Sequence, residues 1–323
     1  MAGSSRPEPG ENLGQERLDM PFTGIASFLR APVCTDLDAL DADVAFIGVP
    51  TDEGSPFMPG SRFGPRALRE HSLRFVSSEP GYYDPQRRRR YLEADMVGRR
   101  MADVGDADIL PTNVVGTFAN ISNSVERIRE RGAMIVALGG DHAITYPVVR
   151  GLQEPIHVLH FDAHLDYMPF VHGLEYTNQH AFRQLRALPT VETLTQIGIR
   201  SIRNTQEMLE DSLGDGNHVV TMEEFRRSPT DVVSAAVPEG AACYVSIDID
   251  VLDMPLVPGC VSAEPDGMSY GELRDTLRQV AKRARVIGFD LVEVNPLLDV
   301  RTGVTAYLGA HTVIEFLGAI RDH

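Results

Sequence analysis

The sequence predicts an α/β fold, a three-layer α-β-α sandwich around a mostly parallel sheet. Short, nearly continuous apolar runs alternate along the chain with longer segments of helical length or periodicity. Strands that are apolar on both faces are typical of a parallel sheet covered by helices on both sides. No internal repeat and no strong linker interrupts this alternation. We therefore expect one domain over residues 17–323, preceded by a flexible tail over residues 1–16, which is rich in Gly, Pro, Ser and charge.

The predicted strands are short runs of β-branched and other apolar residues. They are Val44–Val49, Ala133–Leu138, Ile156–Phe161, Thr193–Ile199, Cys243–Ile249 and Val286–Val294. The predicted helices lie between these runs and have helical length or apolar periodicity. They are Arg62–Leu73, Val114–Arg131, Gln179–Leu188, Ser269–Arg283 and Gly303–Ile320. In open parallel sheets ligands bind outside the carboxyl ends of the strands, so functional residues should follow the apolar runs.

Composition is that of an ordinary soluble globular protein, with 43% hydrophobic and 24% charged residues in a chain of 323. No apolar run approaches the roughly 20 residues that a membrane helix needs. The N-terminus lacks the basic and apolar segments of a secretory signal. Three cysteines without metal-type spacing argue against a disulfide framework. A reducing, cytoplasmic setting is the expectation.

The formal net charge of −16 disfavours binding to nucleic acid or to an anionic membrane, because both need a basic surface. A cationic substrate is compatible with this charge. The one basic block is the run of arginines at 87–90. We interpret this run as a solvated loop or a subunit contact.

Acidic and histidine residues cluster at or just after the carboxyl ends of four of the predicted strands. Side chains alternate between two faces in an extended segment, so acids and histidines two residues apart can point the same way. All four strands would deliver these side chains to the same edge of a parallel sheet. The residues that can converge there are His142, Asp162, His164, Asp166, Asp248, Asp250 and Glu293.

Carboxylates brought so close together need compensation, because like charges repel and raise each other's pKa. Two divalent cations would supply it, and a pair of metal ions can share a hydroxide that is nucleophilic near neutral pH. Carboxylate-rich ligation favours a hard ion such as Mn²⁺ and does not exclude Ni²⁺, Co²⁺ or Zn²⁺. The alternative interpretation is that these acids are only N-caps and turn residues at strand ends. We prefer a binuclear metal enzyme.

Several motifs of the chain resemble those of the ureohydrolases, the family of arginase, agmatinase and guanidinobutyrase. They are Gly-Gly-Asp-His at 139–142, Asp-Ala-His-Leu-Asp at 162–166, Ser-Ile-Asp-Ile-Asp-Val-Leu-Asp at 246–253, Pro-Gly-Ser-Arg-Phe-Gly-Pro-Arg at 59–66 and Gly-Phe-Asp-Leu-Val-Glu-Val-Asn-Pro at 288–296. The resemblance extends from about Leu40 to the C-terminus. It implies the arginase/deacetylase-like fold and hydrolysis of a guanidinium group to urea and an amine.

The resemblance also implies a role for each site residue. One metal ion would be held by His142 and Asp166 and the other by His164 and Asp250, with Asp162 and Asp248 bridging both. Asp166 would in addition relay a proton to the departing amine. Glu293 would pair with the guanidinium nitrogens, which a carboxylate can bind in bidentate fashion.

Two further histidines are weaker candidates. His180 falls where the family places a proton-shuttling histidine that also meets substrate, although His-Ala here replaces the common His-Gly. His172 is either a substrate-pocket residue or a surface histidine of its loop. Cys260 either lines the pocket entrance or is an inert packed thiol.

The loop from Tyr167 to Thr177 is aromatic and apolar, with little to hold the head group of an amino acid. Arginine is therefore disfavoured. The expected substrate is a small cationic guanidine: guanidine itself, an alkylguanidine or biguanide, or a short guanidino acid or amine. An agmatinase or guanidinobutyrase proper is the alternative.

Two other classes of protein compete with this hypothesis. A deacetylase on the related scaffold would use one Zn²⁺ and commonly a paired histidine motif, which this chain lacks. A non-catalytic or partner-dependent subunit should have lost metal ligands, and none is missing. The resemblance also implies a homo-oligomer, a trimer or hexamer, and leaves open a paralogous partner subunit.

Overall fold

A computed structural model describes residues 20–76 and 79–322. Its main feature is an eight-stranded sheet in which every paired neighbour is parallel. In sheet order the strands are β4 (Met101–Asp106), β1 (Val44–Val49), β5 (Met134–Gly139), β10 (Arg285–Val292), β9 (Ala242–Asp248), β6 (Ile156–Phe161), β7 (Val191–Ile199) and β8 (His218–Thr221). All six predicted strands are confirmed, within about two residues at each end. The tail predicted for residues 1–16 lies outside the described residues.

The two strands of this sheet that the sequence did not reveal, β4 and β8, lie at its two edges. Strand β8 has only four residues and is partly exposed, and β4 ends in Gly105 and the exposed Asp106. Edge strands bury fewer side chains, so their apolar pattern is weak. A separate antiparallel hairpin joins β2 (Tyr82–Asp84) to β3 (Arg89–Tyr91) and precedes the short helix α2 (Glu93–Val97).

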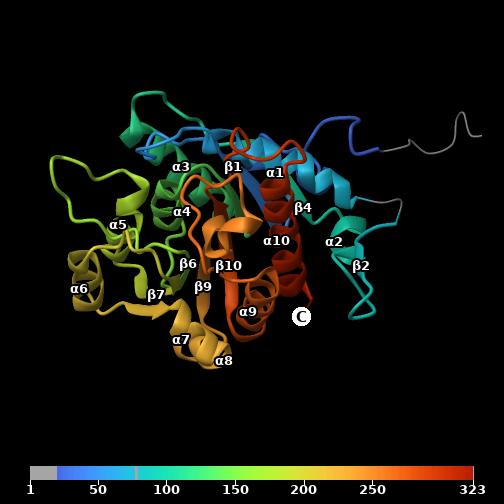
Figure 1. The fold of residues 1–323 in the computed structure, drawn as a ribbon. Helices are drawn as coiled ribbons and strands as arrows, with labels where there is room; N and C mark the ends of the chain where they lie inside the picture. The colour runs from blue at the N-terminus through green and yellow to red at the C-terminus, as the bar shows by residue number, and fades with distance from the viewer. Residues whose placement is uncertain (1–19, 77–78, 323) are drawn as a thin grey trace, which may run out of the picture.

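Helices cover both faces of the sheet, which gives the predicted three layers (Figure 1). One face carries α1 (Gly64–Ser72), α7 (Met222–Arg227), α8 (Pro229–Ala236), α9 (Tyr270–Arg283) and α10 (Val304–Arg321). The other carries α3 (Val114–Glu130), α4 (Thr145–Arg150), α5 (Ala181–Arg186) and α6 (Gln206–Gly214). All five predicted helices are present, whereas the sequence pattern missed α2, α4, α6, α7 and α8.

Side chains alternate between the two faces of the sheet, so the hydrophobic core consists of two clusters, one on each face. In β1, Val44 and Phe46 belong to the cluster under α1 and α10, whereas Ala45 and Ile47 belong to the cluster under α3 and α4. Burial on both faces is the reason that these strands read as continuous apolar runs. In the described part of the chain, no helix is both long enough and apolar enough to span a bilayer.

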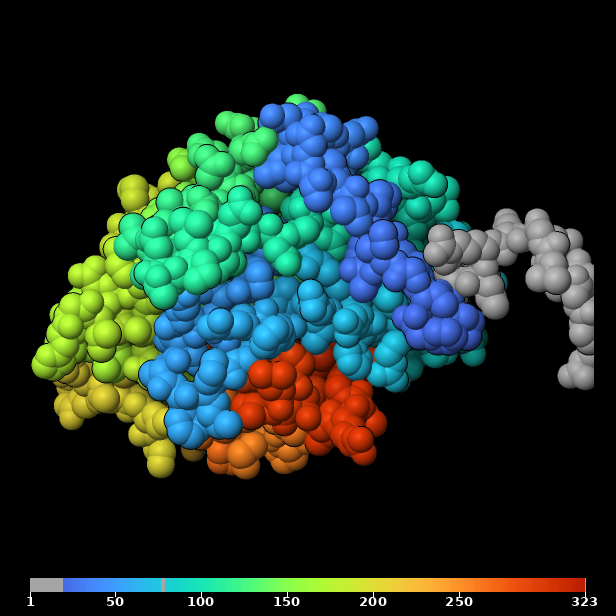
Figure 2. Space-filling model, turned by 90° about the horizontal axis from the view of Figure 1, so that it is seen from above, coloured from blue at the N-terminus to red at the C-terminus, as the bar shows by residue number. Residues whose placement is uncertain are grey.

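The segments that follow β1 and β10, far apart in the sequence, meet at the carboxyl edge of the sheet. Seen from above, the C-terminal segment lies beside the residues that follow β1, red against blue (Figure 2). Asn295 donates a hydrogen bond to the carbonyl of Pro59 at 3.3 Å, and α1 packs against α10. The loops after β1 and β10 therefore close over the same edge of the sheet.

The arginine run at 87–90 is largely neutralised within the chain. Arg87 pairs with Asp84 and Asp275, and Arg89 pairs with Asp322. Arg90 pairs with Glu79. Such paired arginines leave little positive surface for a polyanion.

Arg69 ties helix α1 to the edge strand β4. Its Nε and Nη2 donate to the two carboxylate oxygens of Asp103 at 2.8 and 2.9 Å, and its Nη1 donates to Asp106 at 2.6 Å. Asp103 is buried, with 2% of its surface exposed. This bidentate contact therefore balances a charge that water does not reach.

We expect Arg69→Leu to lower the free energy of unfolding by about 3–5 kcal/mol, because Asp103 would be left buried without its partner. Urea denaturation followed by circular dichroism measures this change. The control is Arg227→Leu, which breaks the exposed pair with Glu223 and should leave the midpoint almost unchanged. Equal effects of the two variants would contradict a special role for the buried pair.

Candidate metal centre

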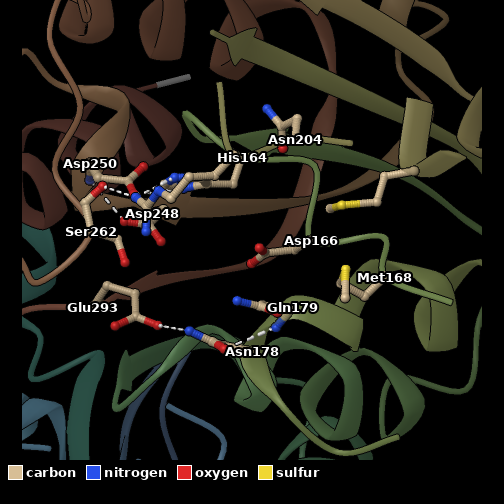
Figure 3. A pocket seen from close by; sticks show the side chains of 12 residues that line it. His164, Asp166, Met168, Asn178, Gln179, Asn204, Asp248, Asp250, Ser262 and Glu293 are labelled. Atoms are coloured by element: carbon tan, nitrogen blue, oxygen red, sulfur yellow. Dashed lines mark hydrogen bonds and ion pairs between the residues drawn. The ribbon is translucent and has the colours of Figure 1, made fainter. Parts of the chain in front are cut away.

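The predicted ligands meet at the carboxyl ends of the four central neighbouring strands, β5, β10, β9 and β6. Asp248 is the last residue of β9, and Asp162 directly follows β6. His142 stands in the turn that connects β5 to α4. The close-up in Figure 3 shows Asp248, Asp250, His164, Asp166 and Glu293 around one cavity. The sheet topology thus brings together residues that are up to 151 positions apart.

One half of the cage surrounds the imidazole of His142. Its Nδ1 lies 2.9 Å from an oxygen of Asp162, 3.3 Å from Asp166 and 3.2 Å from Asp248. None of these three oxygens accepts a hydrogen bond from Nδ1 with acceptable geometry. A ring nitrogen that faces three carboxylates without a directed hydrogen bond has the arrangement of ligands around a common ion.

The other half surrounds His164. Its Nδ1 lies 3.2 Å from the second oxygen of Asp162 and 3.0 Å from Asp250. The two oxygens of Asp162 therefore face different imidazoles, one in each half. This is the placement that a bridging carboxylate needs, and it supports the predicted pair of adjacent ion sites.

The donor set fits divalent cations. The buried atoms His142 Nδ1 and Asp250 Oδ2 make no hydrogen bond within the part of the chain that the structure describes. Buried polar atoms are otherwise almost always satisfied, so these two atoms indicate ligand positions. Imidazole nitrogen with carboxylate oxygen suits Mn²⁺, Ni²⁺ or Zn²⁺ better than Ca²⁺.

A row of polar residues supports the cage from inside the sheet. Gln196, His160, Ser246 and Asp290 lie directly opposite one another across β7, β6, β9 and β10. His142 contacts Ser246 Oγ through its Nε2 at 2.9 Å, and Ser246 in turn donates to Asp290 at 2.7 Å. A proton on Nε2 leaves Nδ1 free as a ligand, which is how such partners orient a metal-binding histidine.

His160 holds Asp162 in the same way. It lies 2.7 Å from the Asp162 carboxylate through Nε2 and 3.1 Å from the Gln196 amide through Nδ1, and its ring stacks on Phe182. Burial lowers the pKa of His160 to about 4, so the ring is neutral and donates from Nε2. The sequence motifs did not single out His160 as a site residue. The signal that marks it is its place two residues before Asp162 on the same face of the strand.

Buried charge perturbs the pKa values of the ligands in the metal-free protein. Burial, reinforced by Asp250 and Asp162, raises the pKa of Asp248 well above its usual range. Burial and the Asp162 charge raise the pKa of Asp166 to about 6. Burial opposes ionisation of His142, but the surrounding carboxylates outweigh it and raise its pKa well above the usual value. The cage therefore retains protons that a bound cation would replace.

Glu293 forms the opposite wall of the cavity. One carboxylate oxygen accepts hydrogen bonds from the His142 backbone at 3.0 Å and from the Asn178 amide at 3.2 Å. Burial raises the pKa of Glu293 to about 7. Its backbone is left-handed, with φ 64°, a conformation that costs a non-glycine residue of order 1–3 kcal/mol and is common at functional sites. Figure 3 shows the Glu293–Asn178 contact at the cavity edge.

The cavity is small, about 70 Å³, and Met168 is one of its walls. The aromatic residues of the Tyr167–Thr177 loop do not line it: Tyr167 is buried against Asp215, and Phe170 is exposed. His172 is exposed on that loop and also lies outside the lining residues. Its role in substrate binding stays a prediction.

His180 lies behind the lining residues rather than among them. The ring stacks on Phe170 and contacts Thr177 through Nδ1 at 2.6 Å and the carbonyl of Pro169 through Nε2 at 3.3 Å. Burial lowers its pKa, so the ring is neutral near pH 7. Its role as a proton shuttle stays a prediction.

Cys260 is buried beside the cage instead of at its entrance. Its sulfur and one oxygen each of Asp248 and Asp250 lie within 4.8 Å of one another. Burial raises the pKa of the thiol well above its usual value, and the nearby carboxylates add to the effect. Cys260 is therefore a packed, protonated thiol.

We expect the purified wild-type chain to bind about two divalent ions, and Asp248→Ala to lose most of this metal, because one oxygen beside His142 disappears. Elemental analysis after removal of free metal measures the content. The control is Asp253→Asn in the same segment, whose side chain accepts a hydrogen bond from Gly267 N and faces no predicted ligand. Full metal content in Asp248→Ala would contradict this ligand set.

Comparisons with known proteins agree with this geometry. The arginase family matches residues 42–318 of the chain. The human mitochondrial guanidino acid hydrolase is 33% identical over 305 residues, which cover 92% of this chain and 83% of that protein. The guanidinobutyrase of Pseudomonas aeruginosa is also 33% identical, over 313 residues and 93% of each chain.

Solved structures show the same fold. The proclavaminate amidinohydrolase of Streptomyces clavuligerus aligns with a TM-score of 0.83 and 28% identity, covering 94% of this chain and all of that chain. A hypothetical agmatinase from Burkholderia thailandensis aligns with a TM-score of 0.79 and 26% identity, covering 94% and 93% of the two chains. By its motifs, its sheet and its His/Asp cage, this chain belongs to the arginase family and is a metal-dependent ureohydrolase.

Proposed function

We propose that this chain hydrolyses a small guanidine compound to urea and an amine with two divalent ions bound in the cage. The observation that carries the proposal is the position of Glu293 across a cavity of about 70 Å³ from the predicted ligands. A guanidinium group is planar and cationic, so a carboxylate can hold two of its N–H groups at once. The small volume supports a compact substrate.

The bound ions would lower the pKa of a water molecule and so supply the nucleophile. The chain's own residues do the rest. Glu293 holds the guanidinium so that its carbon faces the cage. The substrate therefore loses its translational and rotational entropy on binding rather than in the chemical step, and this lowers the activation barrier. A C–O bond forms between the oxygen of a water molecule and the guanidinium carbon, the carbon becomes tetrahedral, and one C–N bond breaks as the departing nitrogen takes up the proton that this oxygen loses. Asp166 lines the cavity and is the residue proposed to carry that proton.

The identity of the metal is part of the proposal. Mn²⁺ suits the carboxylate-rich set, and Ni²⁺ is also compatible with mixed imidazole and carboxylate ligands. Two bound ions distinguish this scheme from a deacetylase that uses one Zn²⁺. Every predicted ligand position carries a residue that can bind a metal ion. This supports a catalytic chain over a non-catalytic subunit. A homo-oligomer and a cytoplasmic location stay predictions of the sequence.

The decisive experiment supplies Mn²⁺ or Ni²⁺ separately to metal-free protein and measures urea release. The panel contains guanidine, methylguanidine, a biguanide, short guanidino acids, agmatine and arginine. We expect urea from at least one small guanidine with one of the two ions. A strong preference for arginine would contradict the proposed substrate class.

We expect Glu293→Gln to keep its metal and to lower kcat/KM by about ten- to a hundredfold, because a charged hydrogen bond to the guanidinium is lost. Urea release and metal content are measured on the same preparation. The control is Glu223→Gln on the exposed end of α7, which should match the wild type. Unchanged kinetics in Glu293→Gln would refute the assigned role.

A further inference from the structure

The cavity contains one permanently cationic residue, which the reaction proposed above does not use. Arg203 lies in the segment between β7 and α6 and is the sole arginine or lysine among the described residues that line the cavity. Its side chain is half-exposed, at 54%. An arginine repels a cationic ligand unless an anion offsets its charge, and Glu264, at 2.9 Å from Arg203 Nε, offsets part of it. A negative group on the ligand would be a second anion for this residue.

The neighbouring Arg200 is more completely engaged in structural contacts than Arg203. The guanidinium of Arg200 donates to backbone carbonyls on three segments of the chain. Its acceptors are Pro265, Gly198, Val251, Asp250, Leu252 and Glu264. Arg200 therefore fastens the loops after β7 and β9 and has no nitrogen left over. Two arginines three residues apart thus have different surroundings.

The N–H groups of Arg203 are only partly used. Its Nε donates to Glu264 at 2.9 Å, and its Nη2 donates to the carbonyl of Ser262 at 2.9 Å and contacts His164 Nε2 at 2.7 Å. Its Nη1 has no partner in the part of the chain that the structure describes. A guanidinium has five N–H donors, so its Nη1 side is available to an acceptor.

Nη1 is therefore the end of Arg203 at which a carboxylate can bind, because Nε and Nη2 already contact acceptors within the chain. A carboxylate oxygen that accepts from Nη1 would make a charge-assisted hydrogen bond, which is roughly twice as strong as a neutral one.

The charges of the cavity are complementary to a zwitterion. Glu293 on one wall suits a guanidinium, and Arg203 on another wall suits an anion. Resting on the proposed function, we propose that Arg203 binds the carboxylate of the substrate, and that the substrate is a short guanidino acid. The second amine of agmatine would instead meet the positive charge of Arg203.

The position of Arg203 limits the length of the acid. Arg203 Nη2 touches the far nitrogen of the His164 ring, whose near nitrogen faces the cage. About one imidazole ring thus separates the Arg203 guanidinium from the predicted ion sites, and the cavity has only about 70 Å³. Few methylene groups fit between a guanidinium at Glu293 and a carboxylate at Arg203. Guanidinoacetate, β-guanidinopropionate and γ-guanidinobutyrate are the compounds of this class.

The test compares each acid with the alkylguanidine that lacks its carboxylate. Urea release from guanidinoacetate, β-guanidinopropionate and γ-guanidinobutyrate is measured against methyl-, ethyl- and propylguanidine, with agmatine as the cationic analogue. For the best acid we expect kcat/KM to exceed that of the alkylguanidine that lacks its carboxylate by at least about tenfold. This is the expected contribution of one charged hydrogen bond. Binding is measured separately, by calorimetric titration of the metal-loaded protein with the amino-acid product and with the corresponding alkylamine.

Substitutions at Arg203 test the residue itself. Arg203→Gln should lower the acid-to-alkylguanidine ratio by about ten- to a hundredfold, mainly through KM, and should abolish the preference for the amino-acid product in the titration. Arg203→Lys should restore part of the ratio, and Arg203→Glu should shift the preference towards agmatine. The control is Arg227→Gln on α7, where the arginine pairs with Glu223 far from the lining residues; its ratio should equal that of the wild type.

The outcomes separate this inference from the proposed function. Urea from alkylguanidines or agmatine in preference to the acids, or a ratio that Arg203→Gln leaves unchanged, overturns the role of Arg203 alone. Absence of urea from every compound with either ion overturns the proposed function and this inference with it. A changed ratio in Arg203→Gln together with the reversed preference of Arg203→Glu supports both.

Discussion

The site depends on one electrostatic constraint: four carboxylates lie close together at one buried edge of the sheet. Asp162, Asp248 and Asp250 are almost fully buried, and Asp166 nearly so. Like charges at such distances cannot all ionise unless cations or protons compensate them. Divalent ions would compensate the carboxylates without requiring them to be protonated. Such ions would also activate a water molecule for hydrolysis. The sheet and its loops therefore hold together four carboxylates that would otherwise repel one another.

Parallel strands meet this constraint because every ligand strand ends at the same edge of the sheet. The ends of β5, β10, β9 and β6 are adjacent, so short turns are enough to aim the acids inwards. Below them, the row from Gln196 to Asp290 fixes the rings and carboxylates from inside the core. A polar row this deep is tolerated because its members are hydrogen-bonded to a neighbour in the row or to a residue of the cage. The positions of the candidate ligands are consequently set by residues of the buried central strands.

The central strands, and the meeting of the candidate ligands at one edge of the sheet, were predictable from the sequence, because burial on both faces and alternation of side chains leave strong local patterns. Edge strands β4 and β8 leave weaker ones. His160, Ser246 and Asp290 were not recognised as supports, since that function depends on cross-strand register, which a single sequence does not specify. The position of Arg203 escaped notice for a similar reason: its relation to His164 and Glu264 arises only when the loops after β6, β7 and β9 meet. Sequence patterns report what each segment does alone and not which segments become neighbours.

The order of the ligand strands along the chain also has a consequence for biosynthesis. Strand β9 lies between β6 and β10, and Glu293 follows β10 close to the C-terminus. A nascent chain on the ribosome thus cannot assemble all four strand ends before Glu293 has emerged, and long-range parallel pairing is slow. The cage therefore forms only after β10 has inserted between β5 and β9, so a cation that needs ligands from all four strands meets them together rather than one strand at a time.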